Sequence, residues 1–158
     1  MKLKFARWAA PLLVCAGTVF AEGPTQAVAI IANGEVAADD LSLAELKRIF
    51  LAEQQFWPDR TRIVLLVQPP GDYARQVVLD RIYGMSEAEY KKYWVAKMFR
   101  AEVPSGPKIV FSVNMAGELV SSIRGAITFV TAADATSTGA KVLRIDGKLP
   151  GELGYPLM

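Results

Sequence analysis

The stretch RIVLLVQPPGDYAR, residues 62–75, decides the fold class. It opens with a run that is apolar after the arginine, as is typical of a strand buried on both faces of a sheet. A Pro-Pro-Gly turn at 69–71 ends this strand. Asp72 then stands where a helix begins, and Gly84 stands just beyond its expected end. The stretch therefore predicts a buried strand that leads directly into a helix over 72–83.

The same alternation continues on both sides of this stretch. Further apolar runs predict strands at 27–32, 108–111, 126–131 and 141–145. Capping boxes at Ser42 with Glu45 and at Ser86 with Glu89 predict the starts of two helices, and a third helix is expected at 113–123. The tail at 146–158 is rich in Gly and Pro, and we expect it to run over the surface. Apolar strands separated by helices predict an α/β fold, a single-domain three-layer sheet with helices on both faces.

One predicted helix carries a stripe of large side chains. Tyr90, Trp94 and Met98 follow one another at intervals of four residues, so they share one helix face. We interpret the stripe as part of the core. If it were left uncovered, it would instead indicate a surface for a protein partner.

The N-terminus has the order of a secretory signal peptide. The first seven residues include three basic residues and no acid, a mostly apolar run follows at 8–20, and Ala21 offers a cleavage residue. The apolar run is too short to cross a bilayer, which needs roughly 20 residues. We therefore expect removal of 1–21 and a periplasmic domain at 22–158. Two alternatives stay open, a buried N-terminal helix and lipoprotein processing at Cys15, which lacks the usual small residue before it.

Charge and composition exclude several classes of function. Three of the 18 basic residues and none of the 16 acidic residues lie in the predicted signal peptide, which leaves 15 against 16 in the domain. So neutral a domain is not expected to bind nucleic acid. The chain has no histidine, and its only cysteine lies in the predicted signal peptide, which excludes His-based triads, thiol nucleophiles and the common zinc sites. A carboxylate-only metal site or a two-carboxylate hydrolase stays formally open. The one adjacent acidic pair, Asp39-Asp40, is interpreted as favouring a helix start rather than as a metal site. We therefore predict a protein that is not an enzyme and has no cofactor or metal.

Several segments resemble, in order, the small periplasmic solute-binding proteins related to the phosphate-binding subunit of ABC transporters. The similar segments are spread over nearly all of 22–158: SLAELKRIFL at 42–51, WPD at 57–59, QPPGDYAR at 68–75, GMS at 84–86, YW at 93–94, GAITFV at 125–130, VLRIDGK at 142–148 and GYPL at 154–157. Each segment is a weak signal alone, and their order and spacing carry the resemblance.

This resemblance implies a type-2 periplasmic binding-protein architecture, of which the chain is long enough for about one lobe. Members of the family hold their ligand in a cleft between two lobes and serve an ABC transporter permease. The resemblance therefore implies an exported solute-binding protein for phosphate or another small oxyanion. One lobe would offer half a site, open to solvent. The alternative hypothesis is a non-catalytic accessory or interaction module of the cell envelope that has lost ligand binding.

The first group of candidate ligand-binding residues lies at the turn that the resemblance assigns to the anion. Gly71, Asp72 and Tyr73 stand at a helix N-terminus, where backbone N–H groups and the helix dipole attract an anion. In phosphate-binding relatives a serine takes the place of Asp72. A carboxylate there would satisfy those donors itself, as a plain N-cap, and would repel an anion. Arg75 is a cation in the first helical turn, so we expect it to pair with Asp72 or with a ligand.

Three further candidates lie elsewhere along the chain. Ser112 and Asn114 open another helix and so supply a second N-terminus, although such a serine is more often only a cap. Asn33 follows the first predicted strand, and open α/β sheets bind ligands beyond the carboxyl ends of their strands. An Asn-Gly pair such as Asn33-Gly34 is also a common turn.

Overall fold

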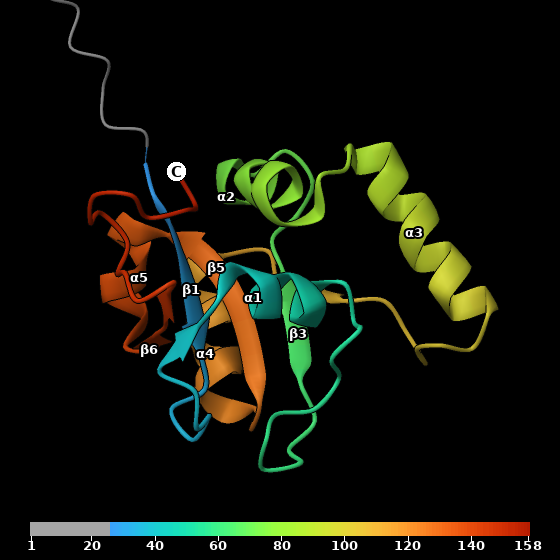
Figure 1. Ribbon diagram of the computed structural model, residues 1–158, viewed down its shortest axis with the longest axis horizontal. Helices are drawn as coiled ribbons and strands as arrows, with labels where there is room; N and C mark the ends of the chain where they lie inside the picture. The colour runs from blue at the N-terminus through green and yellow to red at the C-terminus, as the bar shows by residue number, and fades with distance from the viewer. Residues whose placement is uncertain (1–25) are drawn as a thin grey trace, which may run out of the picture.

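The computed structural model describes residues 26–158 (Figure 1), so the predicted signal peptide and its cleavage residue lie outside the described part. The elements are β1 (Val28–Ala32), β2 (Asp40–Leu41), α1 (Leu43–Phe50), β3 (Val64–Val67), α2 (Tyr73–Val78), the π-helical turn η1 (Leu79–Tyr83), α3 (Glu87–Phe99), β4 (Lys108–Ile109), α4 (Val113–Ser122), β5 (Ala126–Thr131), α5 (Ala132–Thr138), β6 (Lys141–Val142) and β7 (Arg144–Ile145). Within 26–158, no helix combines the length and the apolar character needed to cross a membrane.

The main sheet has the strand order β4-β3-β5-β1-β6. β3 runs parallel to both β4 and β5, whereas β1 runs antiparallel to β5 and to β6. The longest pairing places Val28 opposite Thr131 and Ala32 opposite Ile127. β2 and β7 form a separate parallel pair. Every residue of β1 is buried, which explains why its sequence is continuously apolar rather than alternating.

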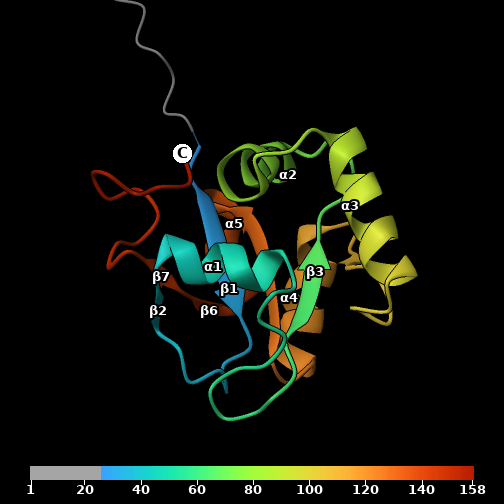
Figure 2. The same cartoon turned by 45° about the vertical axis from the view of Figure 1, so that its right-hand side comes forward.

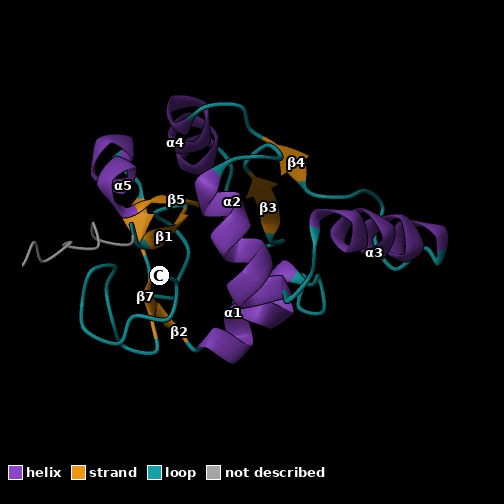
Figure 3. Cartoon of the chain, turned by 90° about the horizontal axis from the view of Figure 1, so that it is seen from above, coloured by secondary structure: helices purple, strands orange, loops and turns teal. Residues whose placement is uncertain are grey.

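Helices cover both faces of this sheet, as the sequence predicts. On one face, Phe50 of α1 and Val78 of α2 pack with Phe129 of β5. On the other face, Val120 of α4 and Ala135 of α5 pack against the sheet. Figure 3 shows the strands between α1 on one side and α4 and α5 on the other. The three-layer α/β prediction is therefore confirmed.

The apolar stripe of α3 is only partly in the core. Tyr90 and Trp94 are buried, and Tyr90 packs edge-on against Tyr83 with ring centroids 5.0 Å apart. Met98, by contrast, is 41% exposed and the neighbouring Phe99 is 91% exposed. In Figure 2 α3 runs along one side of the molecule, with its start beside the α2 region and its end pointing away from it. The prediction of a core position is right for the first two residues and wrong for Met98, because the last turn of α3 extends past the core.

Several elements differ from the sequence prediction: β2 was not expected, the helix predicted over 72–83 ends as the π-helical turn η1, and two further differences concern α5 and the last strand. Residues 132–138 form α5, which was not predicted because only Ala135 of this small, polar helix is buried and no apolar periodicity marks it. The strand expected at 141–145 is divided into two. Leu143 N donates to Ile30 O at 2.9 Å, and the next residue, Arg144, donates its N–H to Asp39 O at 2.9 Å. The chain therefore leaves the main sheet at this point and pairs with β2 instead.

The acidic pair before α1 has a different role from the one expected. Asp40 belongs to β2, and its Oδ1 accepts a hydrogen bond from the backbone N–H of Gly147 at 3.0 Å. Asp146 reaches back in the other direction, since its Oδ1 accepts the N–H of Leu43 at 3.0 Å. A carboxylate from a distant part of the chain thus joins the local carboxylate of Glu45 at the start of α1.

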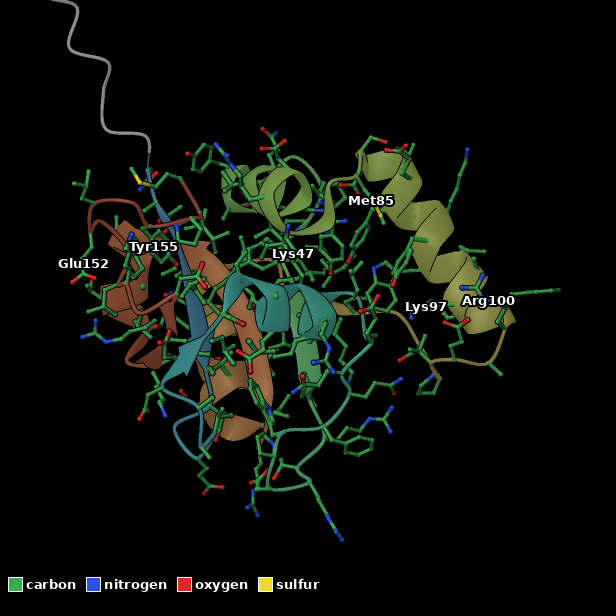
Figure 4. All side chains as sticks on the ribbon, in the orientation of Figure 1. Lys47, Met85, Lys97, Arg100, Glu152 and Tyr155 are labelled. Atoms are coloured by element: carbon green, nitrogen blue, oxygen red, sulfur yellow. The ribbon has the colours of Figure 1, made fainter. Side chains whose placement is uncertain are left out.

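The C-terminal tail is docked rather than laid over the surface, which corrects the expectation. Tyr155 and Leu157 are both buried. The hydroxyl of Tyr155 donates to Val28 O at 2.8 Å, and Val28 N donates to Leu157 O at 2.9 Å. Figure 4 shows Tyr155 on the C-terminal segment beside β1. The tail therefore anchors the first strand through two buried residues. The Gly and Pro content of the segment had indicated a surface loop and gave no sign of this burial.

The hydroxyl of Tyr155 is expected to stabilise the fold measurably. Tyr155→Phe leaves the ring in place and removes one hydrogen bond to a buried carbonyl, so the free energy of unfolding should fall by about 1 kcal/mol. Urea unfolding followed by circular dichroism measures this loss. Tyr73→Phe is the matched control, because its side chain is exposed and the change should be near neutral. Equal losses in the two variants would contradict the docking role.

Candidate functional site

The topology brings three helix starts to one edge of the sheet. Because β3, β4 and β5 are parallel, their carboxyl ends lie at the same edge, and each is followed by a helix: α2, α4 and α5, respectively. We call the segments 68–75, 111–115 and 131–134 the helix-start edge. Open α/β sheets bind ligands at such an edge, and helix N-termini favour anions.

Asp72 occupies the start of α2. Its backbone is extended, with φ −68° and ψ 139°, and its Oδ1 accepts the N–H of Arg75 at 3.0 Å. The N-cap interpretation is therefore confirmed. Gly71 precedes it with φ +90°, a left-handed conformation that glycine adopts without strain. A carboxylate thus uses one of the donors at this N-terminus and places a negative charge beside the rest.

Arg75 is buried and its guanidinium pairs with Glu87 rather than with Asp72. Nε donates to Oε2 of Glu87 at 2.9 Å and Nη2 donates to Oε1 at 2.7 Å, a bidentate pair. Nη1 donates to Gln68 O at 2.7 Å, and the guanidinium carbon lies 4.7 Å from the ring centroid of Tyr90. The structure therefore gives this cation a set of internal partners that join α2 to the start of α3.

The pair also shifts the ionisation of both groups. The hydrogen bond from Arg75 lowers the pKa of Glu87 below its ordinary value of 4.5. Burial acts to lower the pKa of Arg75. The hydrogen bond to Glu87 and the nearby charges act in the opposite direction and together outweigh burial, so the pKa of Arg75 is raised. Both groups are therefore charged at neutral pH.

The starts of α4 and α5 are also capped by their own residues. Ser112 Oγ accepts the N–H of Met115 at 3.1 Å, which confirms the cap interpretation. Thr131 Oγ1 accepts the N–H of Asp134 at 3.2 Å and donates to its carboxylate at 2.6 Å. Thr131 was not singled out from the sequence, because α5 was not predicted. Asn114 is exposed and lines a shallow hollow between α4 and α5, where Thr138 of α5 also contributes to the lining.

Asn33 lies away from the other candidates. It follows β1, which is antiparallel to β5, so it is at the opposite edge of the sheet. Its Nδ2 donates to Val120 O at 2.8 Å and to Ser121 O at 3.1 Å, at the end of α4, whereas Ser112 stands at the start of that helix. The 10 residues of α4 span about 15 Å. The structure thus does not bring Asn33 together with the helix-start edge.

Three apolar side chains are exposed at the helix-start edge. Tyr73 is 40% exposed, Phe111 71% and Met115 39%. They come from the segments that follow β3 and β4, which are neighbouring strands. Phe111 and Met115 were not singled out from the sequence, because an apolar residue beside a strand or in a helix is indistinguishable there from a core residue. Among residues 26–158, no group of three or more acidic, His or Cys side chains is arranged to hold a metal ion.

Comparison with known proteins places this arrangement in a known fold. No protein-family model matches the sequence, and no curated protein matches it either. Solved structures do match. PstS from Borrelia burgdorferi superposes with a TM-score of 0.65 at 14% identity, over 84% of this chain and 54% of that one. An ABC-type phosphate transport receptor from Vibrio cholerae gives 0.62 at 15% identity, over 79% and 48%.

A third match was solved with phosphate bound. It is a phosphate ABC transporter substrate-binding protein from Clostridium perfringens, with a TM-score of 0.59 at 17% identity, covering 77% of this chain and 46% of that one. The chain has the fold of one lobe of a periplasmic binding protein. It spans about half the length of these solved structures. The expectation of a single binding-protein lobe is therefore confirmed at the level of the fold.

Proposed function

We propose that the protein is an exported, non-catalytic solute-binding module whose ligand lies at the helix-start edge. The observation that carries the proposal is the convergence of the starts of α2, α4 and α5, in a fold whose solved neighbours include a phosphate-bound transport protein. Phosphate or another small oxyanion is the ligand class, because helix N-termini supply N–H donors and a positive dipole end. A periplasmic location and an ABC transporter permease as partner belong to the same proposal.

Affinity for phosphate is expected to be weak, for two reasons. The carboxylate of Asp72 stands at the start of α2, and at a separation of about 4 Å it would repel an anion by about 4 kcal/mol at an effective dielectric near 20. Arg75 cannot offset this repulsion by binding the anion unless it gives up its pair with Glu87, because its guanidinium already donates three hydrogen bonds, two to Glu87 and one to Gln68 O. The anion would therefore rely on the helix starts alone.

Replacing Asp72 is the direct test of this proposal. In Asp72→Ser the serine hydroxyl keeps the N-cap while the negative charge is removed. We expect phosphate affinity, measured by isothermal calorimetry at neutral pH, to rise at least about tenfold. Asp80→Ser is the matched control, because Asp80 is exposed on η1, outside the helix-start edge, and its loss changes the net charge equally.

Each outcome of this titration decides one part of the proposal. A gain in Asp72→Ser alone supports an anion site at the start of α2. An equal gain in the control would assign the effect to net charge and contradict that site. The absence of saturable heat up to millimolar phosphate in wild type and both variants would overturn phosphate as the ligand, and sulfate titrated alongside extends the result to oxyanions in general.

A second candidate function is an interaction module that has lost ligand binding. The exposed side chains of Tyr73, Phe111 and Met115 favour this function. Apolar side chains beside a carboxylate are better suited to contact a partner protein than to bind a free anion. The partner would be an envelope protein that presents apolar groups and a basic group opposite Asp72. The phosphate titration separates the two candidates, since this one requires that neither wild type nor Asp72→Ser binds the anion.

A further inference from the structure

A pocket of about 290 Å³ lies between α1, β3 and α3 and shares no residue with the helix-start edge. The last turn of α1, the segment that leads into β3, and the loop at 103–107 form its walls. Its lining is largely apolar and includes Ile49, Ile63, Leu65, Trp94 and Val103. Pockets with an apolar lining and a few polar groups are the usual form of small-molecule sites.

The charged groups of this pocket are all positive. Arg62 and Lys108 line it, and its lining contains no Asp or Glu. Neither cation forms an ion pair with any residue in 26–158. The lining therefore includes two basic residues that have no ion-pair partner within 26–158.

The basic residues at the end of α3, in contrast, do have an acidic partner. Lys97 and Arg100, labelled in Figure 4, both pair with the carboxylate of Glu102. Glu102 is held beside the pocket, since its carbonyl accepts a hydrogen bond from Gln55 at 3.2 Å. Its carboxylate is thus engaged by α3 and not by the cations of the pocket.

The sheet register separates the two cations. Lys108 pairs with Leu66 across β3 and β4, and Arg62 stands four residues before Leu66 on the same chain. At about 3.3 Å per residue, their backbones are about 13 Å apart along the strand. The apolar lining extends between them, with Ile63 and Leu65 on β3 and its approach. Arg62 and Lys108 are thus separated along the strand direction, and both belong to a lining that also includes Ile63 and Leu65.

We propose that this pocket binds a small organic dicarboxylate with an apolar chain between its acid groups. Arg62 would hold one carboxylate, for which a guanidinium fork is well matched, and Lys108 would hold the other. The aliphatic residues and the ring of Trp94 would contact the chain. Inorganic phosphate does not fit this pocket, because it would meet one cation and leave the apolar lining without a partner.

A series of six-carbon probes tests the proposal. Adipate, hexanoate and hexanol carry two, one and no carboxylates on the same chain length, and phosphate supplies charge without a chain. Two-dimensional NMR of the purified protein follows the indole N–H of Trp94, and Trp57, whose Nε1 donates to Gly125 O at 3.0 Å, is the internal reference. We expect adipate to bind best, with a loss of about fivefold for each carboxylate removed. Equal affinity for adipate and hexanol, no shift at Trp94, or tighter binding of phosphate would each overturn the proposal.

Paired substitutions identify the groups responsible. Arg62→Gln with Lys108→Gln should reduce adipate affinity to that of hexanol. Arg60→Gln with Lys92→Gln removes the same charge from exposed positions outside the pocket and should leave binding unchanged. Equal losses in the two pairs would contradict the proposal. Asp72→Ser should not alter adipate binding, which makes this test independent of the helix-start edge.

Discussion

Gly125→Ala is expected to lower the free energy of unfolding by about 3 kcal/mol, the largest effect among the glycine substitutions considered. Gly125 has φ +77°, and an added Cβ would lie 2.3 Å from Arg62 O and 2.9 Å from Thr61 Cγ2. The left-handed backbone costs about 1–2 kcal/mol for an alanine, and forcing an atom into a packed site adds about 1–3 kcal/mol.

The backbone at Gly125 cannot easily move to relieve this contact. Its carbonyl accepts hydrogen bonds from Trp57 Nε1 at 3.0 Å and from Val64 N at 3.1 Å. These bonds hold together the start of β5, the turn at Trp57 and the start of β3. A shift of the glycine would therefore break contacts among three segments.

Gly139→Ala separates the two contributions. Gly139 also has a positive φ, +64°, but no atom lies within 4 Å of the position of its added Cβ. We expect it to lose only about 1 kcal/mol. Urea unfolding of both variants gives the comparison, and similar losses would show that the contact with Arg62 does not constrain the fold.

Arg75→Ala is expected to destabilise the protein by about 3 kcal/mol. The substitution removes both hydrogen bonds to Glu87 and the bond to Gln68 O, and it leaves that carbonyl and that carboxylate without their partner. Urea unfolding measures the loss. Arg81→Ala is the matched control, because Arg81 is exposed and forms only a surface pair with Asp80 at 3.4 Å, so its loss should stay below about 0.5 kcal/mol. A loss in Arg75→Ala no larger than that of the control would contradict a structural role for the pair.

The pH dependence of stability gives a second measurement on the same variant. The pKa of Glu87 is lower in the folded protein than its ordinary value of 4.5, since Arg75 donates hydrogen bonds to it. The stabilisation from this shift is therefore complete above the unfolded pKa and is lost as the pH falls through the folded pKa. Between pH 5 and pH 3, Arg75→Ala should lose less stability than wild type. Parallel pH profiles would show that the pair does not lower this pKa.

The two effects also change how a ligand role for Arg75 must be tested. Loss of anion binding in Arg75→Ala would follow from the broken link between α2 and α3 whether or not the guanidinium touches a ligand. Asp72→Ser avoids this difficulty, because the substitution keeps the cap on α2. Asp72 is therefore the residue at which an anion site can be tested with the fold intact.

The sequence by itself determined the local elements and the layered fold. Ser42 with Glu45 and Ser86 with Glu89 form the expected capping boxes, and Asp72 and Ser112 are the expected caps. These predictions succeed because a cap is closed by hydrogen bonds within three residues of the chain, so its signal is contained in a short window. Continuously apolar strands such as 27–32 indicated burial on both faces for the same local reason. α5 was not predicted because its small, polar residues bury little surface and leave no apolar pattern in the sequence.

Only the tertiary structure decided which groups meet. The direction of β1 moved Asn33 to the edge opposite the helix-start edge, and the placement of α3 gave Arg75 a carboxylate 12 residues away in place of Asp72. Tyr155 reaches Val28 across 127 residues of sequence. Strand direction, register and docking are set by packing summed over the whole core, and no short window of sequence contains that sum. The pocket with Arg62 and Lys108 depends on the same long-range pairing, because β3 and β4 bring its two ends together.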